Sequence, residues 1–97
     1  MPNPKIIWSR QAKESLKDIY NYYKEKSLQG AKNVRSDLIN APRKIVYARQ
    51  YQIDEINPNY RRIVVRDYKL LYKESESIIM IMDIVGTRQS PELLKEK

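Results

Sequence analysis

The sequence predicts an α+β domain: an N-terminal strand, a helical hairpin, and a three-stranded antiparallel meander, with both helices on one face of a small twisted sheet. Three observations predict this class. Apolar residues recur at helical spacing in the first half of the chain, and at strand spacing in the second half. A polar segment with a turn signal separates the halves. Helices and strands that are segregated in this way are typical of α+β folds.

The chain begins with a short apolar segment, Lys5 to Trp8, that we expect to form a strand. Ser9 follows, and its hydroxyl can accept a hydrogen bond from the free amides of a helix start. Apolar residues then return at steps of four, three, one and three: Ala12, Leu16, Ile19, Tyr20 and Tyr23. This spacing predicts a first helix that ends near Lys26.

A second amphipathic helix is predicted over about residues 31–48. Gly30 is expected to end the first helix and reverse the chain. The apolar positions beyond it repeat at steps of three and four: Ala31, Val34, Leu38, Ala41 and Ile45. Pro42 lies inside this repeat and lacks a backbone donor, so we expect a kink or break near residues 39–41.

The second half of the chain predicts the sheet. Residues 49–59 are polar and irregular, and Asn57-Pro58-Asn59 is a turn signal. Strands are expected over residues 60–66 and 68–73, followed by a turn at 74–77 and a last strand over 78–85 that Gly86 breaks. The last strand is the most apolar, so we expect it to be central. Two helices separate it from the first strand and can act as a crossover, which favours parallel pairing of the two.

Length and composition limit the possible functions. With 97 residues, the chain is expected to be one domain, residues 1–97. The 19 basic and 12 acidic residues give a net charge of +7, which favours a polyanionic partner such as nucleic acid or an acidic protein. No segment is apolar enough to predict a signal peptide or a membrane span, and we expect a cytoplasmic protein without a membrane partner.

The chemistry of the side chains is equally restricted. The chain has no cysteine and no histidine, which excludes disulfides, thiol catalysis and thiolate metal sites. The carboxylates are scattered, whereas hard cations need several converging oxygens. We therefore expect no cofactor and no metal.

The segment YRRIVVRDYKLLY, residues 60–72, offers the main candidate for function. Side chains of a strand alternate between its faces. One face is expected to carry Tyr60, Arg62, Val64 and Arg66, and the other Arg61, Ile63 and Val65. Such a row of guanidinium groups on a stiff strand can bind phosphate.

The order of the elements and four short motifs resemble the RelE/ParE superfamily, the toxins of type II toxin-antitoxin modules. The motifs are Trp8-Ser9, the helix pattern A-x-x-x-L-x-x-I-Y-x-Y-Y from Ala12, the strand pair YRRIVVRDYKLLY, and a last strand that closes on V-G-T-R at residues 85–88. The resemblance implies a toxin that a cognate antitoxin holds inactive. One branch of the superfamily cleaves messenger RNA on the ribosome, and another inhibits DNA gyrase.

If the chain is a metal-independent endoribonuclease on ribosome-bound mRNA, the expected catalytic residues are Arg62, Lys69 and Arg88. Arg61, Arg66 and Tyr68 are expected to bind the nucleic acid or another target. By the resemblance, Lys69 and Arg88 lie where nuclease members often carry arginines. RNA cleavage also needs a proton acceptor, and the candidates are weak ones: Lys69, Glu55, Tyr60 and Tyr68.

Two alternatives to the nuclease remain at this point. The ribosome-dependent branch usually places a tyrosine, or a histidine-tyrosine pair, near the C-terminus, where this chain has Pro91-Glu92-Leu93-Leu94. This absence and the missing histidine favour a non-catalytic gyrase inhibitor, which needs neither acid nor base. The intact row of cations on the strands favours the nuclease, so both stay open. A third interpretation is a basic nucleic-acid-binding module without toxicity.

Overall fold

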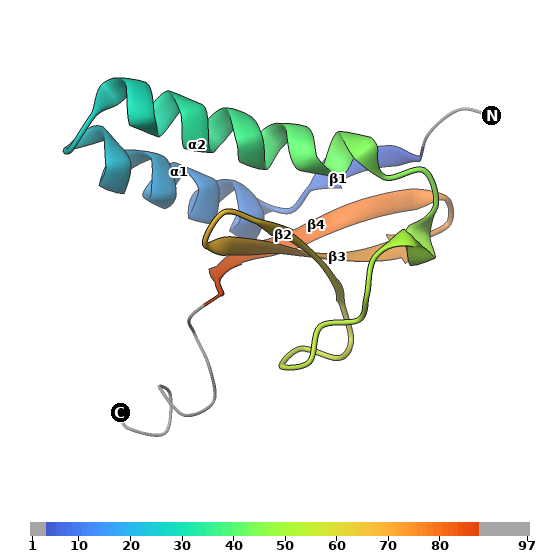
Figure 1. Cartoon of the computed structure of the whole chain (residues 1–97). Coiled ribbons are helices and arrows are strands. Elements are labelled where there is room, and N and C mark those ends of the chain that lie inside the picture. The colour runs from blue at the N-terminus through green and yellow to red at the C-terminus, as the bar shows by residue number, and fades with distance from the viewer. Residues whose placement is uncertain (1–3, 88–97) are drawn as a thin grey trace.

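The computed structural model describes residues 4–87 and confirms the α+β class. Its helices and strands follow one another in this order: β1 (Lys5–Trp8), α1 (Arg10–Lys24), α2 (Leu28–Asn40), the 3-10 helices η1 (Ala41–Lys44) and η2 (Ala48–Gln50), β2 (Arg61–Val65), β3 (Tyr68–Ser75) and β4 (Ile78–Gly86). Both α-helices lie as an antiparallel hairpin over one face of a single sheet (Figure 1). No helix in this part of the chain is long and apolar enough to cross a membrane.

The sheet has the strand order β1-β4-β3-β2. β1 pairs with β4 in parallel, and the two other pairs are antiparallel. The predicted central place of the last strand and its parallel pairing with the first are therefore confirmed. The α-hairpin forms the crossover between β1 and the meander.

The turn between the helices differs from the prediction. Ser9 caps α1 as expected, because its Oγ accepts from the Ala12 amide at 3.0 Å. The helix ends at Lys24, however, and Ser27 caps α2 by accepting from the Gly30 amide at 3.0 Å. Gly30 therefore lies in the first turn of α2, and the prediction that it ends the first helix was wrong. A serine cap set the start of α2 three residues earlier.

Proline ends the second helix, near the predicted break. α2 stops at Asn40, and Pro42 lies in the tighter turn η1. Its missing donor is harmless there, because the first amides of a helical turn have no partner within it. The apolar repeat to Ile45 continues past this break, so the helix predicted over residues 31–48 is really an α-helix and a short 3-10 helix.

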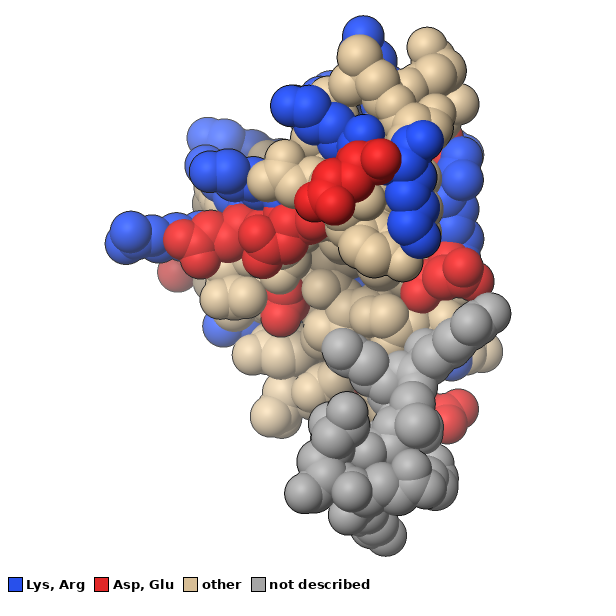
Figure 2. All heavy atoms as spheres, turned by 90° about the vertical axis from the view of Figure 1, so that its left-hand side faces the viewer, with Lys and Arg blue, Asp and Glu red and all other residues tan. Residues whose placement is uncertain are grey.

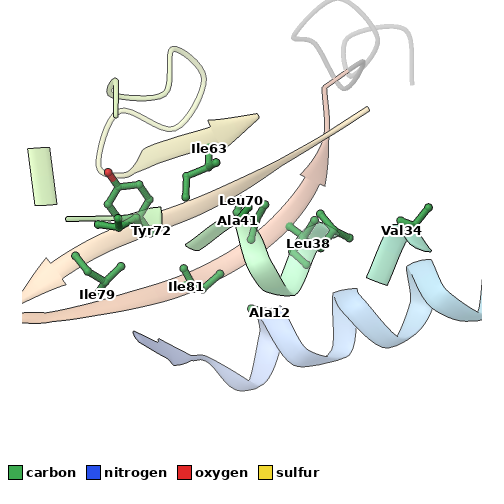
Figure 3. Packing of buried hydrophobic residues seen from close by; sticks show 11 residues of the cluster. Ala12, Val34, Leu38, Ala41, Ile63, Leu70, Tyr72, Ile79 and Ile81 are labelled. Carbon is green, nitrogen blue, oxygen red and sulfur yellow. The ribbon is translucent and has the colours of Figure 1, made fainter. Parts of the chain in front are cut away.

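The core lies between the helices and the sheet (Figure 3). Ile63, Leu70 and Ile84 come from three neighbouring strands and are all buried against the helices. Their neighbours in sequence, Val64 and Lys69, therefore point to the opposite face of the sheet. The residues of the buried cluster are Ala12, Val34, Leu38, Ala41, Ile45, Ile63, Leu70, Tyr72, Ile79, Ile81 and Ile84.

The connector between η2 and β2 runs back along the edge of β2. Ile53 and Arg61 form an isolated antiparallel bridge. Two backbone hydrogen bonds flank the bridge, from the Arg62 amide to Gln52 at 3.0 Å and from the Asp54 amide to Tyr60 at 2.9 Å. These contacts place Asp54 beside the sheet face that the helices leave uncovered.

Candidate functional site

Several of the predicted functional side chains meet at one hollow of about 420 Å³ on the face of the sheet away from the helices. Arg62 comes from β2, Lys69 from β3, and Arg66 from the turn between them. Thr87 also lines the hollow. Arg88 follows Thr87 in sequence but lies outside the described residues. The residues that line the hollow are Asp54, Glu55, Ile56, Arg62, Val64, Arg66, Lys69 and Thr87.

The Lys69 ammonium is bound inside the molecule. Its Nζ donates to Asp54 Oδ1 at 2.6 Å. Lys69 is only 8% exposed and Asp54 is 0% exposed. A charge so far from water requires a hydrogen-bonded partner of opposite charge, and Asp54 is that partner.

Asp54 also organises the connector in which it lies. Its Oδ2 accepts from the backbone amides of Ile56 and Asn57, at 3.2 and 2.8 Å, and from Asn57 Nδ2 at 3.2 Å. Burial alone would raise the pKa of this carboxyl, but the hydrogen bonds from Lys69 and Asn57 together outweigh burial and lower the pKa below its ordinary value. Asp54 therefore remains ionised and accepts from both Lys69 and the connector.

Arg62 lies at the rim of the same cluster, with its Nη1 3.9 Å from Asp54 Oδ1 and its side chain 21% exposed. The guanidinium donates to the carbonyl of Ile53 at 2.9 Å and to Gln52 Oε1 at 3.2 Å. It therefore fastens the connector to β2. Fewer of its donors remain for a phosphate than the sequence alone suggested.

Arg66 reaches the hollow from outside the strands. It is the first of the two residues in the β2–β3 turn and has a φ of 56°, a left-handed conformation that is unusual for arginine. Its Nε lies 2.7 Å from Asp37 Oδ2 of α2, and both side chains are about half exposed. This ion pair can open in water at little cost.

Arg61 and Tyr68 lie apart from the hollow. Arg61 donates to the carbonyl of Tyr51 at 2.8 Å, from the face that Ile63 also occupies. The Tyr68 hydroxyl lies 3.4 Å from that of Tyr23 on α1. Burial and this contact raise the pKa of Tyr68, so the phenol remains protonated at neutral pH and is a poor proton acceptor.

Asp54 is the residue that sequence reasoning missed as a member of the site. Its signal was present: an aspartate three residues before Asn57 and the turn Asn57-Pro58-Asn59 is a typical acceptor for the amides that follow it. The partner Lys69 is 15 positions away and could not be found from local spacing. Glu55, a predicted proton acceptor, is exposed at the hollow.

The geometry limits what this hollow can do. It gathers three cationic side chains, but each one already donates to a carboxylate or carbonyl of the same molecule. Among residues 4–87, no group of histidine, cysteine, aspartate and glutamate side chains could hold a metal ion. A phosphate entering here would compete with Asp54 for Lys69 and with Asp37 for Arg66.

Comparison with known proteins identifies the family. Residues 6–91 match the sequence model of the family described as "ParE toxin of type II toxin-antitoxin system, parDE". The chain belongs to this ParE toxin family. The resemblance to the RelE/ParE superfamily is thereby confirmed, and this ParE family member is a type II toxin.

A solved structure supports the fold of this ParE family member. The structure titled "Chromosomal ParDE TA system from P. aeruginosa" superposes with a TM-score of 0.75 at 17% sequence identity, over 86% of this chain and 95% of that chain. At this identity, the likeness establishes the common fold. A search of curated protein sequences found no match.

Proposed function

We propose that this ParE family toxin inhibits growth by binding DNA gyrase, without catalysing a reaction of its own, and that a cognate antitoxin holds it inactive. The observation that carries the proposal is the buried ion pair between Lys69 and Asp54 at 2.6 Å. Lys69 is the strand residue that the sequence offered both as a cation to stabilise the phosphate and as a proton acceptor. Family membership points in the same direction.

The ion pair argues against a nuclease for a chemical reason. Cleavage of RNA by its own 2′-hydroxyl needs a group that accepts a proton and a cation that stabilises the crowded phosphate. An ammonium that donates to a buried carboxylate has no free lone pair, and its charge is already balanced. Tyr68, with its raised pKa, does not replace it.

One observation favours a second candidate, the ribosome-dependent endoribonuclease. Arg62, Arg66 and Thr87 line the same hollow, and Arg88 is the next residue in the chain. Arg62 and Arg66 are partly exposed and could contact a phosphate once their hydrogen bonds within the molecule open. This activity would need a proton acceptor other than Lys69, and Glu55 is the exposed carboxylate at the hollow.

The two functions are separated by two assays on the same purified protein. In a supercoiling assay with gyrase, relaxed plasmid and ATP, we expect loss of supercoiling and trapped gyrase-DNA cleavage complexes. In a translating extract, primer extension is expected to find intact messenger RNA. Codon-positioned cuts that disappear in the Arg62→Gln/Arg66→Gln variant, together with unaffected gyrase, would select the nuclease instead.

A further inference from the structure

The positive charge of this protein is displayed mainly by the helical hairpin and not by the sheet. Lys13, Lys17 and Lys24 of α1 and Lys32 and Arg35 of α2 are all exposed, and none of the five forms an ion pair within residues 4–87. We call these five residues the helical cation stripe. Figure 2 shows Lys and Arg around the helical upper part of the face that it presents, with Asp and Glu side chains between them.

Helical geometry aligns the three lysines of α1. At about 100° per residue, Lys13, Lys17 and Lys24 fall within about 40° of one another and extend over about 16 Å of the helix axis. The acidic residues of α1, Glu14 and Asp18, follow a separate line about 100° away. The helix therefore separates its charges into a positive and a negative stripe.

The second helix extends the positive stripe. Arg35 lies across the interhelical seam from Lys13 and Lys17, and these three side chains line one hollow of about 350 Å³ together with Leu16 and Tyr20. Asp37, the acid of α2, instead binds Arg66 on the side toward β2. The stripe therefore combines cations from two rigid elements, and no carboxylate of residues 4–87 forms an ion pair with them.

The surroundings of the stripe favour a polyanion over a protein surface. A protein partner needs several large exposed apolar side chains as anchors. Within residues 4–87 only one of them, Leu28, shares a helix face with the stripe, four positions before Lys32. The others are Tyr22, Val46, Tyr47, Ile53, Ile56 and Val64. Leu16 and Tyr20 are half-buried between the helices. Long lysine side chains at intervals along a rigid helix suit successive phosphates of a nucleic-acid backbone.

We propose that the helical cation stripe binds the phosphate backbone of duplex DNA without reading its sequence. The inference goes beyond the proposed function, because DNA contact does not depend on which enzyme the toxin inhibits. It also assigns nucleic-acid binding to a different part of the molecule from the arginine row of β2. If gyrase is the target, the same contact would hold the toxin against the DNA that gyrase carries.

The test is binding of the purified full chain to a 20-base-pair duplex of random sequence, measured by fluorescence anisotropy without gyrase. If about three phosphates are neutralised, raising the salt from 50 to 200 mM should weaken binding about 40-fold. The variant Lys13→Gln/Lys17→Gln/Arg35→Gln should lose most of this salt dependence and bind at least about tenfold more weakly at 50 mM salt. Glutamine is a good helix former, so the hairpin should be retained.

The matched control removes the same charge from other elements. Lys5 of β1, Arg49 of η2 and Lys73 of β3 are exposed and have no ion pair within the described part of the chain. The variant Lys5→Gln/Arg49→Gln/Lys73→Gln should bind within about threefold of the wild type.

Three results would overturn the proposal. An equal loss in both variants would mean that binding follows net charge alone. A wild-type affinity that does not change with salt would exclude phosphate contact. Unchanged DNA binding by the helical variant, with loss of its complex with the antitoxin, would assign the stripe to an acidic protein. These results are distinguishable from a failure of the gyrase proposal. In that case the gyrase assay would be negative while the purified protein still binds DNA.

Discussion

The hollow on the sheet and the helical cation stripe contain the same kinds of side chains in opposite states. Lys69 and Arg62 in the hollow are held by Asp54 and by backbone carbonyls. Lys13 and Lys17 on α1 are exposed and have no ion pair within residues 4–87. A count of charges along the chain would treat the two regions alike, but only the helical cation stripe has cations fully available to a partner.

Burial explains the difference. A lysine that a strand directs beneath a connector loses its hydration, and only a carboxylate with good geometry compensates for that loss. A lysine on the outer face of a helix keeps its water and needs no partner. Internal neutralisation is therefore expected where the chain folds over its own cations, as residues 52–60 do next to β2 and β3.

The difference between the hollow and the stripe predicts that the largest loss of stability follows from a substitution at Asp54. Replacing Asp54 with alanine would leave the Lys69 ammonium buried without a counterion and would remove the acceptor that orders the connector. We expect the free energy of unfolding to fall by about 3–5 kcal/mol. Urea denaturation followed by circular dichroism measures it.

A double variant checks the cause of this loss. Asp54→Leu/Lys69→Met removes both charges, and we expect it to recover part of the stability that Asp54→Ala loses, since an apolar pair has no desolvation cost. If the double variant is no more stable than Asp54→Ala, the unpaired charge is not the source of the effect. Lys13→Gln, from the exposed region, should change the free energy of unfolding by no more than about 0.5 kcal/mol.

The same ion pair predicts how stability changes in acid. The pKa of Asp54 is lower in the folded protein than its ordinary value of 3.8. Its stabilising contribution is therefore fully present above that value and disappears as the pH falls through the lower, folded pKa. We expect the stability difference between the wild type and Asp54→Asn to be constant above about pH 5 and to shrink below pH 3.8. A difference that is independent of pH would mean that Asp54 does not contribute through its charge.

Local patterns in the sequence predicted the elements better than the site. The 3.6-residue period located both helices, and the two-residue period together with short apolar runs located the four strands, because these patterns follow from burial against a common core. The turn at Ser27 and the contact between Lys69 and Asp54 depend on other forces: a serine cap overrode the glycine signal, and folding joined two charges that are 15 positions apart. Alternation along a strand predicts the face of a side chain but not what covers that face.

A much smaller effect than at Asp54 is predicted for Arg66, the cation of the hollow that is most exposed. Its ion pair with Asp37 is about half exposed on both sides and contributes no more than about 1 kcal/mol. A positive φ costs an arginine about the same amount relative to glycine. We therefore expect Arg66→Gly to change the free energy of unfolding by less than about 1 kcal/mol in either direction, and Asp37→Asn to destabilise by no more than this.

The functional readout of these two variants then separates folding from function at the hollow. The fold does not need an arginine at a left-handed turn position, which leaves the half-exposed guanidinium of Arg66 for an external contact. If Arg66 contacts the target, Arg66→Gly should weaken gyrase inhibition while Asp37→Asn, which frees the guanidinium, should preserve or strengthen it. Equal loss of inhibition in both variants would instead indicate that the ion pair itself shapes the surface that the target recognises.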